Sequence, residues 1–385
     1  MNIALFYHSL VSDWNHGNAH FLRGVATELQ VRGHQVRIFE PEDAWSVRNL
    51  RAEHGEGALR HFREAYPSLE STGYTLADFD VEEALRDIDL VLVHEWNAPE
   101  LIRRIGALRP RRSVALFHDT HHRFVTAPGA WGRDELEGYD GVLAYGRVLR
   151  DRYLAAGMTG RAWTWHEAAD TRVFHPRART ALDGDLVWIG NWGDGERNEE
   201  LREFLIGPVH ELRLQARAYG VRYPAEAIHA LARAGIEYGG WLPNQDAPEV
   251  YSRFKVTLHV PRRVYASVLP GIPTIRVFEA LACGIPLISA PWADTEGLFT
   301  PGRDFLVAAN GVETRELLRK LLANPGLRQA VAEHGLATIR RRHTCAHRVD
   351  ELMGIVAELR PALRTEAART PPTEPVREAR PVALR

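Results

Sequence analysis

The stretch of the chain best suited to chemistry is residues 270–292, PGIPTIRVFEALACGIPLISAPW. Its pattern predicts a loop, a two-turn helix, a tight turn at Gly284 and a buried strand. Thr274 is the expected N-cap, and the free backbone N–H groups of a helix end attract anions. Glu279 follows about 7.5 Å along the axis, at about 1.5 Å per residue. A diphosphate at the helix end would bring its ribose near Glu279, whereas the alternative is an amphipathic core helix carrying one surface glutamate.

A polar loop, HSLVSDWNHGNAH, follows the first predicted strand at residues 8–20. Gly17 and Asn18 precede a helical pattern, so the loop could hold a phosphate against the start of that helix. The spacing is not G-x-G-x-x-G, and it therefore does not predict a dinucleotide fingerprint. The alternative is a polar surface loop. The loop also contains three candidate general bases for an acceptor hydroxyl, namely Asp13, His16 and His20.

A second polar cluster, HDTHH at residues 118–122, follows the apolar strand pattern of residues 114–117. Open α/β sheets keep their chemistry at the carboxyl ends of their strands, so His118 and Asp119 are candidates for binding sugar hydroxyls. Neighbouring residues on an extended strand end point to opposite sides, and few of these side chains could share one metal ion. We therefore predict no metal site. Simple loop polarity is the alternative for the cluster.

In the second half, a glycine-rich loop, GNWGDGERN at residues 190–198, follows a predicted strand. Its glycines allow a ligand to approach the backbone near Asn191, and Arg197 at the start of the next helix could pair with phosphate oxygens. Arg262 and Arg263 follow another strand and are further candidates for the diphosphate charge. Surface arginines are common in this chain, so solvated side chains are the alternative for all three arginines.

Apolar strand patterns alternate with helical patterns throughout both halves of the chain, as in parallel sheets covered by helices on both faces. We expect two doubly wound, Rossmann-like α/β domains that face a central cleft. The predicted parts are a first domain (1–168), a second domain (169–344), a helix returning to the first domain (345–362) and a disordered tail (363–385). The polar region 45–79 is predicted to be an insertion, and residues 212–216 a strand.

Composition narrows the classes of function. The formal net charge of −2 gives no general basic field for nucleic acid. The two cysteines, Cys283 and Cys345, are far apart in sequence and provide no disulfide framework. No apolar run reaches the length of a membrane span, and the N-terminal residues lack a basic leader. We expect a cytoplasmic enzyme.

With these motifs assembled, the chain resembles the group-1 nucleotide-sugar glycosyltransferases of the two-domain GT-B fold, and within them the branch similar to the spore maturation protein CgeB. The resemblance covers about residues 1–360. It is carried by HGNAHFLRG (16–24), WIGNWGDGERNEELREFL (188–205), PTIRVFEALACGIPLISAPW (273–292) and RHTCAHRVDEL (342–352), with the connector DTRVFHP at 170–176.

The resemblance implies transfer of a sugar from a nucleoside diphosphate, most simply a UDP-sugar, to an unidentified acceptor without a cofactor or an obligatory metal. The second domain would hold the donor. Glu279 would then bind the ribose, Thr274 and Arg197 the diphosphate, and His118 would lie beside the donor sugar. Gly17 and Asn18 would approach the diphosphate from the first domain.

One departure from the family concerns a second glutamate, which group-1 enzymes usually carry before the ribose-binding residue. This chain has Gly271 in that region, eight positions before Glu279. The backbone amides of Gly271 and Ile272 could contact the sugar instead. Retention of the anomeric configuration is slightly favoured, since front-side attack needs no dedicated base.

Two alternatives follow from the same residues. One is a sugar-nucleotide epimerase of the same fold, which would act on its own substrate without an acceptor. The other is a protein that binds nucleotide sugars without catalysis. The acceptor could be a polysaccharide, a protein, a lipid-linked sugar or a small metabolite.

Overall fold

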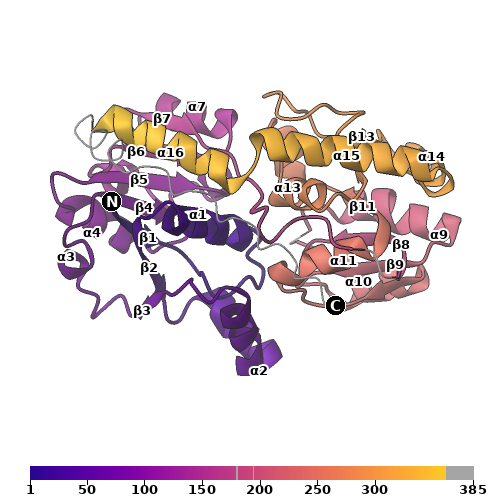
Figure 1. Ribbon diagram of the computed structural model, residues 1–385, viewed down its shortest axis with the longest axis horizontal. Helices are drawn as coiled ribbons and strands as arrows, with labels where there is room; N and C mark the ends of the chain where they lie inside the picture. Colours follow the sequence, from indigo (N-terminus) through magenta and orange to yellow (C-terminus); the bar gives the residue numbers. More distant parts are fainter. Residues whose placement is uncertain (179–180, 194, 361–385) are drawn as a thin grey trace, which may run out of the picture.

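The computed structural model describes residues 1–178, 181–193 and 195–360. It contains two α/β domains, each built on one parallel sheet, that lie next to each other (Figure 1). This confirms the fold class expected from the alternation of apolar strand and helix patterns.

The first domain has a seven-stranded sheet of order β3-β2-β1-β4-β5-β6-β7. Its strands are β1 (Asn2–Phe6), β2 (Gln35–Pro41), β3 (Thr72–Tyr74), β4 (Leu90–His94), β5 (Val114–Asp119), β6 (Gly141–Ala144) and β7 (Ala162–Thr164). Its helices are α1 (Ala19–Val31), α2 (Trp45–Ala65), α3 (Val81–Ala84), α4 (Pro99–Leu108), α5 (Arg123–Thr126), α6 (Arg133–Leu136) and α7 (Arg147–Ala155).

The second domain has a six-stranded sheet of order β10-β9-β8-β11-β12-β13. Its strands are β8 (Gly184–Ile189), β9 (Ala216–Tyr219), β10 (Ile236–Tyr238), β11 (Phe254–His259), β12 (Leu287–Ser289) and β13 (Leu306–Val307). The helices that follow β8 are α8 (Asn198–Leu201), the π-helix η1 (Arg202–Ile206) and α9 (Gly207–Leu212). The later ones are α10 (Ala225–Arg233), η2 (Asn244–Asp246), α11 (Ala247–Ser252), α12 (Arg263–Ser267), α13 (Ile275–Ala282), α14 (Gly311–Ala323), α15 (Pro325–Arg342) and α16 (Cys345–Leu359).

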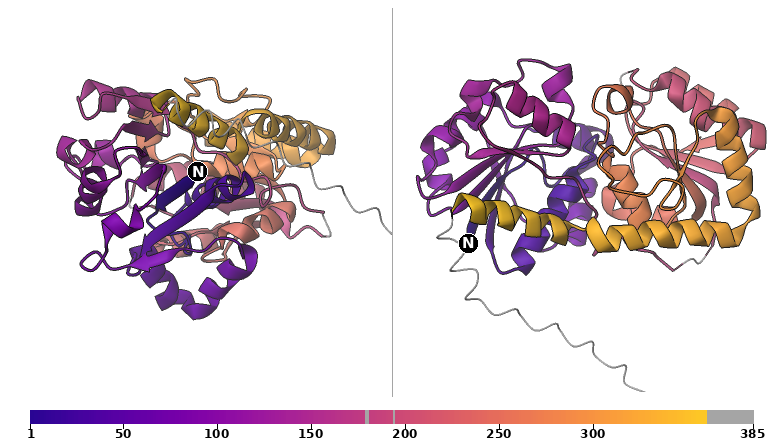
Figure 2. Two further views of the ribbon diagram at one scale, coloured as in Figure 1. Left: turned by 60° about the vertical axis from the view of Figure 1, so that its left-hand side comes forward. Right: turned by 90° about the horizontal axis from the view of Figure 1, so that it is seen from above.

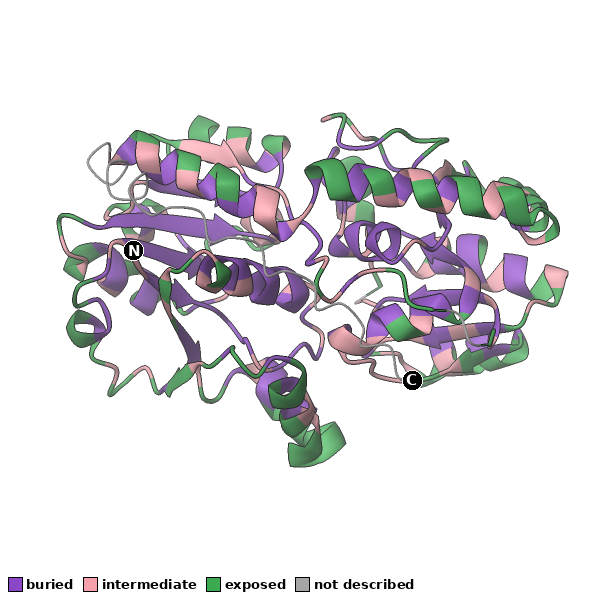
Figure 3. Ribbon diagram, viewed as in Figure 1, coloured by how far each residue is buried: buried purple, intermediate pink, exposed green. Residues whose placement is uncertain are grey.

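Successive side chains of a strand point to opposite faces of the sheet, so the buried residues form separate clusters on its two sides (Figure 3). Ile3 and Leu5 of β1 face one cluster, which includes α1 and α16, while Ala4 and Phe6 face a second cluster with α4 and α7. The first cluster continues through Phe174 of the connector into α13 of the second domain. The two domains therefore share one apolar core across their interface.

The chain passes between the domains twice, and the two crossings are hydrogen-bonded to each other. The N–H of Ala169 donates to the carbonyl of His343 at 3.0 Å, and the N–H of Cys345 donates to the carbonyl of Ala169 at 2.9 Å. Beyond this point α16 runs across the first domain and packs on α1, where Gly24 leaves room for the Cys345 sulfur (Figure 2). The returning helix expected from the sequence is confirmed.

Three further expectations have different outcomes. The predicted strand at residues 212–216 is wrong in its position, because helix α9 continues to Leu212 and Arg213 then takes a left-handed conformation before β9. The insertion at 45–79 is mainly helix α2, which is kinked at Gly55, followed by β3. The predicted tail 363–385 lies outside the described residues, and within them no helix is both long and apolar enough to cross a membrane.

Candidate active site

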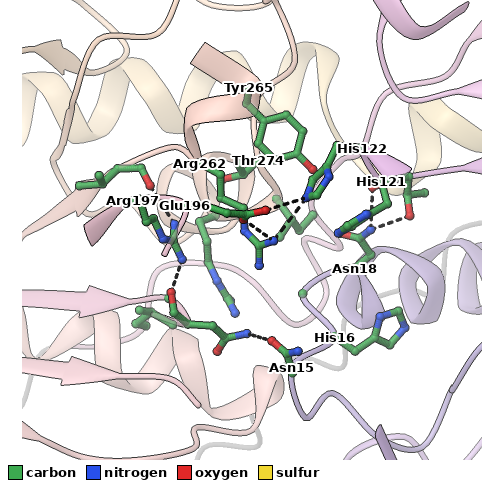
Figure 4. A pocket seen from close by; sticks show the side chains of 18 of the residues that line it. Asn15, His16, Asn18, His121, His122, Glu196, Arg197, Arg262, Tyr265 and Thr274 are labelled. Atoms are coloured by element: carbon green, nitrogen blue, oxygen red, sulfur yellow. Dashed lines mark hydrogen bonds and ion pairs between the residues drawn. The ribbon is translucent and has the colours of Figure 1, made fainter. Parts of the chain in front are cut away.

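A cavity of about 280 Å³ lies between the two domains, at the carboxyl ends of both sheets (Figure 4). In each sheet the strand order reverses between two neighbouring strands, β1 and β4 in the first domain and β8 and β11 in the second. Open α/β sheets bind ligands at such switch points. Loops that follow all four of these strands contribute to the cavity wall. The cavity is therefore the candidate active site.

Arg197 is the most deeply placed cation on the second-domain wall. Arg197 as a whole is 8% exposed, and its guanidinium donates from Nη1 to the Val260 carbonyl at 2.8 Å and from Nη2 to the Asn191 carbonyl. Its Nε has no hydrogen-bond partner, and among the described residues no carboxylate lies within ion-pair distance. Burial, together with the nearby charge of Arg262, lowers the pKa of Arg197 to about 10, so it remains charged near neutral pH.

Arg262 extends across the cleft toward the first domain. Its Nη1 is 3.0 Å from Glu196 Oε2 and 3.4 Å from His122 Nε2. Figure 4 shows these three side chains pointing toward one another over the cavity. Burial lowers the pKa of His122 to about 4, and its imidazole is therefore neutral at pH 7. The cluster is held mainly by the ion pair of Arg262 with Glu196.

The start of helix α13 provides a third part of the second-domain wall. Thr274 is its N-cap, as predicted, but its hydroxyl pairs with His259 Nε2 at 3.1 Å and makes no capping bond. The first backbone N–H groups of α13 are thereby left without a side-chain partner from Thr274. Ile275 and Arg276 of the first turn also line the cavity. The helix end provides the anion-attracting groups expected from the sequence.

The first-domain loop after β1 faces this helix end. A Cβ added to Gly17 would come within 3.5 Å of the Ile275 side chain, so this loop lies directly against α13. Asn18 donates its side-chain amide to the Thr120 hydroxyl at 2.6 Å, and Asn191 donates across the cleft to the Asn15 side chain at 2.6 Å. Both asparagines line the cavity and connect the loops around it.

Glu279 lies behind the cavity wall and is fully buried. Its carboxylate pairs with Arg276 and accepts from His20 Nδ1 at 3.1 Å and from the Asn244 amide at 3.4 Å. These positive and donor groups hold the pKa of Glu279 below its usual value despite its burial. Arg276 is the member of this cluster that reaches the cavity.

His20 connects three parts of the chain through one imidazole. Its Nε2 accepts the backbone N–H of Asp170 at 2.8 Å, and the proton must therefore be on Nδ1, which donates to Glu279. Its ring also stacks on Phe174 with 3.8 Å between centroids. Helix α1, the connector and helix α13 meet at this side chain. This arrangement makes His20 a positioning residue for Glu279, a different role from the predicted general base.

Three other predicted site residues do not line this cavity, although Asp13 lines a smaller pocket that adjoins it. Asp13 pairs with Arg23 at 3.0 Å and accepts from Trp241 of the second domain at 3.0 Å. His118 and Asp119 are buried beneath the cleft, where Asp119 accepts from Tyr153 at 2.7 Å. Asp13 and Asp119 are thus occupied by partners within the protein, while His118 packs against the rings of Phe21 and Trp165 and its Nε2 has no hydrogen-bond partner.

The remaining three predicted residues belong to the second domain and lie outside the cavity wall. Arg263 points outward to Glu200, because it is the first residue of α12 and leaves the wall just after Arg262. Gly271 has a φ of +91° and its Cα faces the Thr295 hydroxyl. Ile272 packs against Gly146 of the first domain. No side chain or Cα of these residues lines the cavity.

The structure also adds cavity residues that the motifs did not single out. The hydroxyl of Tyr145, in the first domain, donates a hydrogen bond to the hydroxyl of Tyr265, in the second domain, at 2.9 Å. Glu167, between β7 and the connector, carries a buried carboxyl oxygen without a partner. No local motif marks these residues, and the sequence contained no signal for them. Among the described residues no group of three or more His, Cys, Asp and Glu side chains could hold a metal ion.

Comparisons with known proteins agree with this architecture. Residues 197–354 match a family model described as glycosyl transferase-like. An alpha-glucosyltransferase solved with UDP and DNA has a TM-score of 0.69 and 12% identity, covering 93% of this chain and 99% of that one. The fold is GT-B. No curated protein sequence matches the chain.

Two further GT-B structures have similar overlap. HepE from Anabaena, in complex with UDP and glucose, has a TM-score of 0.65 and 13% identity, covering 93% of this chain and all of that one (100%). Sucrose-phosphate synthase from Thermosynechococcus elongatus has a TM-score of 0.63 and 14% identity over 96% of this chain and 100% of its own. The GT-B fold thus covers both domains, and the glycosyl transferase-like match falls on the second domain and the start of the returning helix.

Proposed function

We propose that this protein is a glycosyltransferase that moves a sugar from a UDP-sugar to an acceptor hydroxyl. The observation that carries the proposal is the interdomain cavity with buried Arg197 on its wall, a cation without a carboxylate partner among the described residues. A diphosphate would supply the missing negative charge. The glycosyl transferase-like match of residues 197–354 and the UDP complexes of structural neighbours support the same donor class.

In this proposal the diphosphate lies between Arg197 and the start of α13. Thr274 and the first amides of the helix bind one side, while Gly17 and Asn18 approach from the first domain. These fixed charges and dipoles stabilise the negative charge that develops on the leaving UDP, in a cavity from which the two domains exclude water. Positive charge at this position comes from the protein, and we propose that no metal ion is required.

The ribose would bind toward Glu279. Because Arg276 pairs with that carboxylate and also lines the cavity, binding requires Arg276 to release the carboxylate and turn toward the diphosphate. His20 would keep the Glu279 carboxylate in place during this exchange.

Retention of the anomeric configuration is our preferred outcome. Of the three candidate bases, Asp13 is engaged by Arg23 and His20 by Glu279. His16 lines the cavity, but burial and neighbouring positive groups hold its pKa well below its usual value, which makes it a poor proton acceptor. Front-side attack needs no dedicated base, whereas inversion does.

A thermal-shift panel of nucleoside diphosphates and UDP-sugars tests the donor class. Binding at 100 times the dissociation constant should stabilise the folded protein by about 2.7 kcal/mol. Absence of a shift with every nucleotide would refute the proposal. Incubation with the bound UDP-sugar then separates the activities, since an epimerase forms a new sugar nucleotide without an acceptor and a non-catalytic binder leaves the donor intact.

A further inference from the structure

Glu167 is a buried acid that reaches the candidate active site from the loop between β7 and the connector. Its side chain is 3% exposed and lines the cavity. Its Oε1 has no hydrogen-bond partner. Buried polar groups in proteins are nearly always paired, and an unpaired carboxyl oxygen at a cavity therefore points to a ligand as its partner.

The backbone around Glu167 is held firmly on both sides. Trp165 donates its indole N–H to the Arg348 carbonyl at 2.8 Å. His166 Nδ1 pairs with the Tyr145 carbonyl at 2.9 Å, and its Nε2 with Glu296 at 3.1 Å. The carboxyl is thus presented to the cavity by a fixed segment, as a preorganised binding group requires.

The surroundings of Glu167 differ from those of the diphosphate subsite. Burial, together with the nearby charges of Glu279 and Glu95, raises the pKa of Glu167 well above its usual range. The phenols of Tyr145 and Tyr265 line the same cavity, and the charge of Glu167 is close enough to add to the rise in their pKa that burial causes. A neutral acid and two phenols offer no positive charge to a diphosphate, but they pair well with hydroxyl groups, which can both donate and accept hydrogen bonds.

We propose that Glu167 binds a hydroxyl group of the sugar carried by the nucleotide donor. The inference rests on the proposed function, because it divides one cavity between a cationic end for the diphosphate and an acid-phenol end for the sugar. Glu167 acts here as a binding group for the donor sugar and takes no proton from the acceptor.

The test compares UDP with the UDP-sugar that binds most tightly among UDP-glucose, UDP-galactose and UDP-N-acetylglucosamine, using calorimetry on the full chain. Glu167→Met fills a similar volume but cannot form hydrogen bonds. It should weaken UDP-sugar binding by about tenfold or more, the cost of leaving one buried hydroxyl unpaired, while UDP binding changes by less than about threefold. Glu167→Gln, which retains a donor and an acceptor, should keep both the affinity and the turnover within about threefold.

Glu95→Gln is the matched control. Glu95 is also a fully buried acid, burial raises its pKa to about 8, and it does not line the cavity. This variant should leave the ratio of UDP-sugar to UDP affinity unchanged. Thermal unfolding of each variant confirms that it is folded.

Two results would overturn the inference. One is a Glu167→Met protein in which UDP and UDP-sugar affinities change equally or not at all. The other is a Glu167→Gln protein that binds UDP-sugar normally but loses more than about a hundredfold in turnover, which would identify a proton acceptor. Failure of the wild-type protein to bind UDP or any UDP-sugar would instead refute the proposed function.

Discussion

His20 offers the sharpest test of how the two domains support the candidate site. Its imidazole accepts from the Asp170 N–H and donates to Glu279, and both partners are buried. The two functions can be separated by substitution. Asparagine can place a donor near the position of Nδ1, and glutamine can place an acceptor near that of Nε2, whereas alanine removes both groups.

Each buried group left unpaired costs about 1–3 kcal/mol of folding free energy. We therefore expect His20→Ala to destabilise the protein by about 2–6 kcal/mol, and the asparagine and glutamine variants by about 1–3 kcal/mol each. At about 2–4 °C per kcal/mol for domains of this size, the alanine variant should unfold at a temperature about 4–24 °C lower. The asparagine and glutamine variants, which each lose one of the two hydrogen bonds, should unfold at a temperature about 2–12 °C lower than the wild type.

Thermal unfolding and UDP calorimetry together check the reasoning. If His20 positions Glu279 for the ribose, His20→Gln should weaken UDP binding about tenfold and His20→Asn by less than about threefold. His61→Ala is the control. His61 also pairs across the domains, with Asp246 at 2.9 Å, but both side chains are 42% exposed and the pair should contribute less than about 1 kcal/mol.

The reasoning would be refuted if His20→Ala unfolded within 2 °C of the wild type, the smallest shift that about 1 kcal/mol would give. Equal loss of UDP affinity in the asparagine and glutamine variants would show that the bond to Glu279 has no special part in binding.

Three more predictions test other parts of the structure. Calorimetry of Arg197→Ala should show UDP affinity about 10–100-fold weaker, as for the loss of a charged hydrogen bond, while Arg263→Ala, outside the cavity, should bind UDP normally. Gly24→Ala should destabilise the protein in thermal unfolding, since its Cβ would lie 2.5 Å from the Cys345 sulfur, whereas Gly354→Ala, with open space in α16, should stabilise it by up to about 1 kcal/mol. Burial lowers the pKa of His259 to about 3 in the fold, so the stability from its neutral form is present above about pH 6.5 and is lost as the pH falls toward 3. His259→Asn should flatten that decline in unfolding midpoints measured from pH 7 to pH 4, and an unchanged decline would count against this assignment.

The sheets could be predicted because their apolar runs are short and bounded by polar loops. The loops of the candidate site were also recognisable. Residues from every donor motif lie on the cavity wall, namely Gly17, Asn18, Asn191, Arg197, Arg262 and Thr274. Whether they bind a donor stays a prediction. Glycines, cations and a helix cap at strand ends are local signals, and the fold brings the strand ends together.

The remaining placements depend on contacts between distant parts of the chain. Glu279 is one helical turn beyond the residues that face the cavity, and its depth is set by His20, 259 residues earlier in the chain. His118 belongs to the strand itself, while His121 and His122, just past its end, face the cavity. Glu167 lies in the loop between β7 and the connector, which has no periodicity, and its position follows from the docking of both domains. Sequence patterns carry no information of this kind.

The chain crosses between the domains at Ala169 and at His343–Cys345, and these two crossings, hydrogen-bonded to each other, form a single hinge line. If the domains open, turning about this line would keep both connections and their mutual hydrogen bonds intact. His20 is hydrogen-bonded to Asp170, the residue next to this hinge line. Its hydrogen bond to Glu279 therefore lies close to the hinge, where a rotation of the domains displaces atoms least. Opening would then release a nucleotide from the outer part of the cavity first, while the end near Glu279 keeps its shape for the next donor.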